Sequence, residues 1–269
     1  MQLNVLVDNH TYIDQYYYGE PAVSYYIETG KTRLLFDTGY SDILLKNAKN
    51  MQIPLDRLTH IVLSHGHNDH SGGLRYLCDA LDLSHTELLA HPDCFLPKYD
   101  GAESIGAPLT AEILSGRLLY HPCSKPYQIQ ENLTFLGEIP RINDFENPAP
   151  IGNQLRSGQW EPDRLLDDSA LVYQNTDGIF IITGCSHSGI CNIIDYAKKV
   201  CNEPRILGVL GGFHLFDYDS RVKNTIQYLE SCNIRRLYPC HCVSLQVKAK
   251  LMEKLPVAEV GVGMTIRIE

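Results

Sequence analysis

The sequence has no long apolar run, no basic cluster and no framework of paired cysteines, and each absence argues against a class of protein. No apolar stretch approaches the roughly 18 residues that a membrane span needs. The first residues lack the basic start, apolar centre and cleavage site of a signal peptide, so we expect a cytoplasmic protein that does not bind membranes. Because Lys and Arg are not clustered and the formal net charge is −9, we expect no nucleic-acid partner.

The cysteines do not form the pattern of a secreted disulfide scaffold. There are nine of them, an odd number, and they are scattered between residues 78 and 242. We therefore expect most thiols to be reduced. Five are interpreted as small apolar residues of the core or near the surface, namely Cys78, Cys94, Cys191, Cys201 and Cys232.

The composition is that of a folded protein. Of the 269 residues, 44% are hydrophobic and no tract is compositionally biased, which argues against disorder. We expect a single domain over residues 1–269. Residues 92–162 contain nine of the fourteen prolines and have an irregular pattern, with strands expected only at 118–120 and 133–136. Such a stretch is typical of a functional lid or insert.

Strands and helices alternate through most of the remaining chain, which predicts a mixed α/β fold. Apolar alternation and turn residues predict strands at 1–7, 24–28, 33–36, 60–64, 88–91, 170–173, 178–183, 206–210 and 236–238. Helical spacing predicts helices at 41–50, 74–83, 190–200 and 221–232.

Histidine-bearing turns follow four of these strands. The first turn reads His65-Gly66-His67-Asn68-Asp69-His70, and Gly66 allows a close approach that a larger residue would block. Residues 65 and 67 can point to one side and bind one metal, while Asp69 and His70 can bind a second. The other turns carry His187, His214 and His241. Because strand ends gather at one edge of an α/β sheet and imidazole is a common metal ligand, the sequence predicts a metal site there.

His65-x-His67-x-Asp69-His70 after a strand resembles the signature of the metallo-β-lactamase superfamily, and Asp37-Thr38-Gly39 resembles its early strand-end motif. The segments 184–189, 211–214 and 240–242 resemble a branch of metal-dependent hydrolases within it. Some members of that branch are named for a pterin-forming step, as 7,8-dihydropterin-6-methyl-(ribofuranosyl)aminobenzene 5′-phosphate synthase. The resemblance covers nearly the whole chain and implies an αββα sandwich of two sheets with helices outside.

The resemblance also implies a ligand set. His65, His67, Asp69 and His70 match family ligands directly, and His241 matches the final histidine. The usual histidine before residue 170 is absent, because Arg164-Leu-Leu-Asp-Asp168 stands there, and we infer that His187 replaces it. Cys185 stands where a bridging Asp is expected, either as a thiolate ligand or as a buried thiol beside the site.

Three further features of the sequence are open to more than one interpretation. His214 is a candidate ligand, substrate-binding donor or general acid, and its alternative is a histidine satisfied by local hydrogen bonds. Cys240 and Cys242 flank His241, but a zinc ribbon would need a partner Cys-x-x-Cys that the chain lacks. Similarly, the run Tyr16–Tyr18 either helps to cover the cleft or packs beside a strand.

The main functional hypothesis is hydrolysis of an ester, lactone, amide or phosphoester by a water activated at one or two Zn²⁺ ions, with Fe or Mn as alternatives. Asp69 would orient the water or accept its proton, and His214 is the second catalytic candidate. The expected partner is a small-molecule substrate. No oligomeric state is predicted.

Two other functions stay open. One is a metal-dependent transferase of pterin or folate-like biosynthesis, for which the candidate phosphate contacts are Lys125, Arg141, Arg156 and Arg164. The other is a non-catalytic metal-binding or sensing protein. A redox role like that of flavin-linked di-iron relatives is disfavoured, because His67 stands where those relatives carry an acidic residue.

Overall fold

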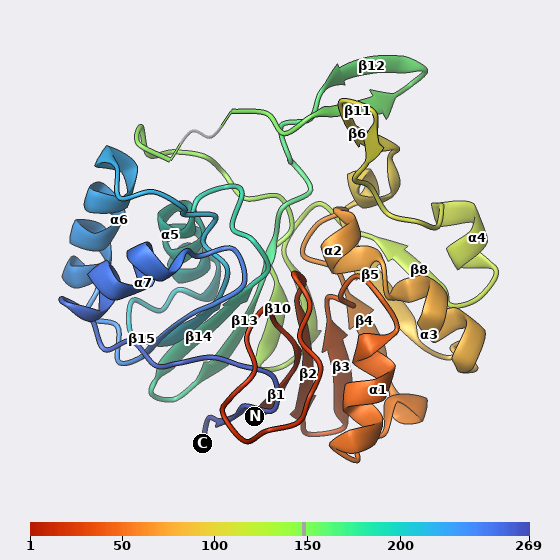
Figure 1. Ribbon diagram of the computed structural model, residues 1–269, viewed down its shortest axis with the longest axis horizontal. Helices are drawn as coiled ribbons and strands as arrows, with labels where there is room; N and C mark the ends of the chain where they lie inside the picture. Colours follow the sequence, from red (N-terminus) through yellow and green to blue (C-terminus); the bar gives the residue numbers. More distant parts are fainter. Residues whose placement is uncertain (147–148) are drawn as a thin grey trace. The chain divides into compact units, whose positions relative to one another are not determined.

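The computed structural model describes residues 1–146 and 149–269 (Figure 1). The chain divides into two compact units. The first comprises Met1–Ser124, Pro150–Asp167 and Gly261–Glu269, and the second comprises Lys125–Ala149 and Asp168–Val260. The single domain expected over residues 1–269 stays a prediction.

Among its described residues, the first unit contains a seven-stranded sheet in the order β17-β1-β2-β3-β4-β5-β8. Strands β3, β4, β5 and β8 are parallel, so their carboxyl ends lie at one edge. The strands are β1 (Gln2–Val7), β2 (Ser24–Thr29), β3 (Thr32–Phe36), β4 (His60–Val62), β5 (Glu87–Ala90), β8 (Leu119–Pro122) and β17 (Thr265–Arg267).

One face of this sheet packs against helices. Leu6, Leu35, Ile61 and Leu88 of the sheet share a buried cluster with apolar residues of α1, α3 and α4. The helical segments of this unit are α1 (Ile43–Asn50), η1 (Leu55–Arg57), α2 (Asn68–Ser71), α3 (Leu74–Ala80), η2 (Pro92–Phe95) and α4 (Ala111–Ser115).

A separate four-stranded sheet of the first unit has the order β12-β11-β6-β7. Its strands are β6 (Lys98–Asp100), β7 (Glu103–Ser104), β11 (Asn153–Arg156) and β12 (Gln159–Pro162). Tyr99 pairs with Asn153, so residues far apart in the sequence lie side by side in this sheet (Figure 1).

Among its described residues, the second unit has a six-stranded sheet in the order β16-β15-β14-β13-β10-β9, in which β14, β15 and β16 are parallel. The strands are β9 (Tyr127–Gln130), β10 (Leu133–Phe135), β13 (Ala170–Asn175), β14 (Gly178–Thr183), β15 (Ile206–Gly211) and β16 (Leu237–Pro239). The helices are α5 (Ile190–Cys201), α6 (Ser220–Ser231) and α7 (Leu245–Met252).

Helix α5 shows why this unit folds as it does. Ile190, Ile193, Ile194 and Ala197 follow the spacing of one helix face, and all four are buried in a cluster with residues of β13, β14 and β15. Helix α6 begins after Asp219, whose side chain accepts a hydrogen bond from Val222 N at 2.9 Å. None of the described helices is both long and apolar enough to cross a membrane.

The predicted strands and helices outside residues 92–162 agree with the structure to within a few residues at their ends. Within 92–162, the strands expected at 118–120 and 133–136 correspond to β8 and β10, and the stretch also contains η2, α4, β6, β7, β9, β11 and β12, which were not predicted. The stretch is divided between the two units. Residues 147–148 of this stretch lie outside the described residues. Its role as a lid stays a prediction.

Candidate metal centre

The predicted ligand turn of the first unit joins β4 to α2. His67 precedes the first residue of α2 with extended backbone angles, so the chain turns sharply between His65 and Asp69. The rings of His65 and His70 have centroids 4.1 Å apart, and those of His65 and His67 are 4.7 Å apart. One ligand atom from each of His65, His67 and Asp69 lies within 4.8 Å of the other two. These three donors are therefore placed to share one cation.

Gly66 allows this crowding. A Cβ atom at this position would lie 2.0 Å from the carbonyl oxygen of Cys94, which is backbone and cannot give way. A larger residue would push the turn away from η2, and His65 and His67 would move with it. The role predicted for Gly66 agrees with this packing.

Asp37, at the end of β3, fixes the orientation of His70. Its carboxylate accepts hydrogen bonds from His70 Nδ1 at 2.7 Å, from Ser64 N at 2.7 Å and from Ser64 Oγ at 2.7 Å. Asp37 and His70 are both fully buried. Because Nδ1 is held by the carboxylate, Nε2 is the nitrogen that His70 presents on its other side, where Asp69 Oδ2 lies 3.6 Å away.

The electrostatic setting of His67 suits a metal ligand. Burial lowers the pKa of His67 to about 4, although the carboxylates of Asp69 and Asp167 partly oppose this. At neutral pH the imidazole is therefore uncharged. This is the protonation state in which histidine binds a metal ion.

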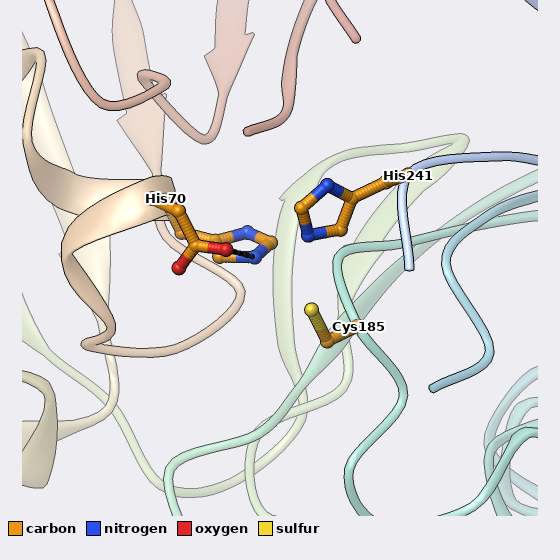
Figure 2. Close-up of side chains that lie close together, drawn as sticks. His70, Cys185 and His241 are labelled. Carbon is orange, nitrogen blue, oxygen red and sulfur yellow. Dashed lines mark ion pairs between the residues drawn. The ribbon is translucent and has the colours of Figure 1, made fainter. Parts of the chain in front are cut away.

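The predicted ligands of the second unit, Cys185, His187 and His241, come from two loops, and the catalytic candidate His214 comes from a third. Cys185 and His187 follow β14, His214 follows β15 and His241 follows β16, so the three parallel strands bring them to one edge of their sheet. A ligand atom of Cys185 lies within 4.8 Å of one on His187 and also of one on His241. Figure 2 shows the Cys185 and His241 side chains pointing toward one another from separate loops.

His214 is placed next to His187, with ring centroids 4.5 Å apart. The ring of Phe216 also packs against His214, with centroids 4.7 Å apart. The role of His214 stays a prediction. No cation-binding group of the described residues includes His214.

Two residues that the sequence analysis did not assign to the site organise these loops. Cys242 Sγ accepts a hydrogen bond from His214 N at 3.2 Å and donates one to the Cys185 carbonyl at 3.7 Å. Asp168 Oδ2 accepts from Ser188 N at 2.8 Å and from Ser188 Oγ at 2.7 Å, directly after His187. Asp168 was noted only because it occupies the stretch where the family histidine was expected.

Arg156, one of the candidate phosphate contacts, forms ion pairs with two acidic residues. Arg156 donates to Asp93 through two guanidinium nitrogens, and to Glu161 Oε1 at 2.8 Å. These contacts use three of its five N–H donors. A phosphate contact of Arg156 stays a prediction.

Comparison with known proteins identifies the family. The model of the family described as the metallo-beta-lactamase superfamily matches residues 17–241, which is more than half of the chain. The chain belongs to the metallo-β-lactamase superfamily. The predicted membership and the predicted mixed α/β metallo-β-lactamase fold are therefore confirmed. This superfamily binds divalent metals, often zinc.

Three relatives illustrate the similarity to other members of the superfamily. An uncharacterized protein of Methanocaldococcus jannaschii is 33% identical over 253 residues, covering 93% of this chain and 94% of the relative. From the same organism, a protein named 7,8-dihydropterin-6-methyl-4-(β-D-ribofuranosyl)-aminobenzene-5′-phosphate synthase is 28% identical, with 94% and 91% covered. A crystal structure of a metal-dependent hydrolase of the β-lactamase superfamily is 27% identical, with a TM-score of 0.84 and coverage of 100% and 99%.

Proposed function

We propose that the chain is a metal-dependent hydrolase acting on an ester, lactone, amide or phosphoester. Its proposed metal ligands are His65, His67, Asp69, His70, Cys185, His187 and His241. The matched family segment, residues 17–241, includes all seven. The observation that carries the proposal is the convergence of one ligand atom each from His65, His67 and Asp69 within 4.8 Å.

The donor set fits a divalent transition metal. Imidazole nitrogens and a carboxylate oxygen are common zinc ligands, and the thiol of Cys185 adds a softer donor that favours zinc over magnesium or calcium. We propose one or two Zn²⁺ ions, with Fe or Mn as alternatives. When bound, such a metal polarises a carbonyl or phosphoryl oxygen and lowers the pKa of water.

Asp69 is the proposed general base. Its side chain is 28% exposed, whereas that of His70 beside it is fully buried, so a substrate can reach this carboxylate. Asp69 orients the attacking water and accepts its proton. His214, which is partly exposed beside His187, donates a proton to the leaving group in this proposal.

The test combines metal analysis with a substrate screen. The purified protein is analysed for bound metal and assayed with generic esters, lactones and phosphodiesters. Replacing Asp69 with Ala is expected to abolish most turnover and to leave the fold intact, as judged by circular dichroism. Asp79→Ala, at an exposed position on α3, is the matched control and should retain wild-type turnover. Full activity of Asp69→Ala contradicts the assignment.

A second function is favoured by one observation. The relative named as a pterin-related synthase aligns over 94% of this chain, which supports a metal-dependent transferase of pterin-like biosynthesis. In a transferase reaction an aromatic amine would attack the second substrate and displace pyrophosphate, which is released, whereas a hydrolase would cleave its substrate by adding water. Mass analysis of the products distinguishes the two. Full metal occupancy without turnover in any assay would instead favour a metal-binding or sensing protein.

A further inference from the structure

Lys98, at the start of β6, is a fully buried ammonium group outside the proposed ligand set. Its Nζ lies 2.7 Å from Asp163 Oδ2 and 3.2 Å from Asp167 Oδ1, and the side chains of all three residues are almost completely buried. Although burial opposes the charge, Asp167 and Asp163 raise the pKa of Lys98, so it stays protonated at neutral pH. The group is therefore a buried cation held by two carboxylates.

One of these carboxylates also binds the ligand turn. Asp167 Oδ2 accepts a hydrogen bond from Gly66 N at 2.8 Å, and Gly66 is the residue between His65 and His67. Asp163 instead accepts from Leu165 N at 2.8 Å, within its own turn. The two carboxylates thus share Lys98, but they hold different segments of the chain.

The backbone of Lys98 binds the same turn from a second direction. Lys98 O accepts from Ile105 N at 3.0 Å, and Ile105 O accepts from Asn68 N at 2.8 Å. Gly106 forms a β-bridge with His67. Lys98 is therefore connected to both sides of His67, through Asp167 at Gly66 and through Ile105 at Asn68.

Stability alone does not account for this arrangement. A buried ion pair gains little free energy over apolar side chains of the same size, because both charges lose their hydration. What an apolar group could not provide is a charged acceptor at a fixed position against Gly66 N. A charge-assisted hydrogen bond at that point restricts the backbone that carries His65 and His67.

We propose that Lys98 and Asp167 are positioning residues that fix the His65–His67 backbone for metal binding. The inference rests on the proposed metal site, and it assigns to these residues a role in metal affinity rather than in the chemical step. Neither residue is a ligand in the proposal.

The experiment compares Asp167→Asn with Asp163→Asn, because both substitutions leave Lys98 with a single carboxylate. Affinity for Zn²⁺ alone is measured by competition with a chelating dye. We expect Asp167→Asn to weaken Zn²⁺ binding by about 10- to 100-fold, the range found when a residue that holds a metal ligand is lost. Asp163→Asn should bind Zn²⁺ like the wild type. Equal affinities for the two variants would overturn the proposal.

A second measurement does not depend on metal. Hydrogen exchange of the peptide containing Gly66, measured in metal-free protein, should be faster in Asp167→Asn than in Asp163→Asn. If the wild type binds no Zn²⁺, the proposed function fails, yet this exchange comparison still decides whether Asp167 holds the turn. Equal exchange in the two variants would show that it does not.

A further pair covers the case in which Asp167→Asn does not fold. Asp167→Glu and Asp163→Glu both keep the charge that pairs with Lys98, but each moves its carboxylate by one methylene. Asp167→Glu should lower Zn²⁺ affinity and speed exchange at Gly66, while Asp163→Glu should change neither. Wild-type behaviour of Asp167→Glu in both measurements contradicts the positioning role.

Discussion

The two sets of proposed ligands are built differently. In the first unit, four of them come from six consecutive residues, and buried carboxylates hold that turn: Asp37 binds His70 and Ser64, and Asp167 binds Gly66. In the second unit Cys185, His187 and His241 come from two separate loops, and the thiol of Cys242, next to His241, forms hydrogen bonds with the loops of Cys185 and His214. The hydrogen bonds described for the first set go to two buried carboxylates, and in the second set Asp168 accepts hydrogen bonds from Ser188.

The backbone differs as well. In the second set, Ser186, His214 and His241 have positive φ angles of 58°, 49° and 49°, which non-glycine residues adopt at a cost. In the ligand turn of the first set, residues 65–70 are not among those with positive φ. Asp37, which holds the first turn, has a positive φ of 57°, but the turn itself has none. We therefore expect hydrogen bonds to hold the first turn without metal, and the loops of the second set to depend more on a bound metal.

Removing metal is expected to have the largest effect on stability, and it should increase hydrogen exchange unequally in the two sets of ligands. At a metal concentration 1,000 times the Kd, binding contributes about 4 kcal/mol to folding, which corresponds to roughly 10 °C in the melting temperature. Dialysis against a chelator should lower the melting temperature by this order, and reloading with Zn²⁺ should restore it. Hydrogen exchange should increase more in residues 185–188, 212–215 and 240–242 than in 64–70. Faster exchange of 64–70 than of the other segments would reverse the comparison.

Asp37→Ala tests the carboxylates of the first set. The substitution leaves Ser64 N, Ser64 Oγ and His70 Nδ1 buried without their acceptor, and each lost partner costs about 1–3 kcal/mol. We expect the free energy of unfolding to fall by about 3 kcal/mol, measured by urea denaturation of the metal-free protein. Asp42→Ala is the control, because Asp42 forms a solvent-exposed pair with Lys46 and should contribute less than about 1 kcal/mol. A loss no larger than that of the control would refute this account of Asp37.

The contrast between the sets also explains what the sequence could reveal. The ligand turn at 65–70 is contiguous, so its residue types and spacing were visible directly. The amphipathic spacing of α5 and the apolar runs of β13 to β15 predicted their strands and helix for the same reason. Local patterns of this kind depend on neighbours in the chain.

Some of the elements that were missed depend on distant partners. Strands β6 and β7 have three and two residues, and β6 is stabilised by pairing with β11, more than fifty positions later. Strand β17 pairs with β1 at the opposite end of the sequence. Segments this short carry no recognisable alternation, so these three strands were not predicted.

Lys98 and Asp167 show that contacts within the site can also depend on residues far apart in the sequence, which a local pattern does not reveal. A single lysine and a single aspartate separated by 69 positions have no motif, and only the fold brings them together. The adjacent acidic pair Asp167-Asp168, in the place of an expected ligand histidine, was the available signal. In the structure each member holds one histidine-bearing loop within its own unit, Asp167 at Gly66 and Asp168 at Ser188.

Cys242→Ala should have the smallest effect on the free energy of unfolding, and it tests the second set of ligands. The substitution removes a thiol that fills the space against Gly212, where an added Cβ would lie 2.4 Å from Sγ, and that bonds the His214 and Cys185 loops. Because sulfur forms weak hydrogen bonds, we expect a loss of only about 1 kcal/mol in the free energy of unfolding.

The loop that carries His214 should be affected more strongly than overall stability, since it loses its hydrogen-bonded link to Cys185 through Cys242. Hydrogen exchange of residues 212–215 should increase in Cys242→Ala while that of 64–70 stays unchanged. Cys242→Ser, which keeps a donor and an acceptor on a shorter bond, should fall between the wild type and Cys242→Ala. If Cys242→Ala instead destabilises the protein as much as Asp37→Ala, the thiol of Cys242 stabilises the second set as strongly as the Asp37 carboxylate stabilises the first. The proposed difference between the two sets would then be wrong.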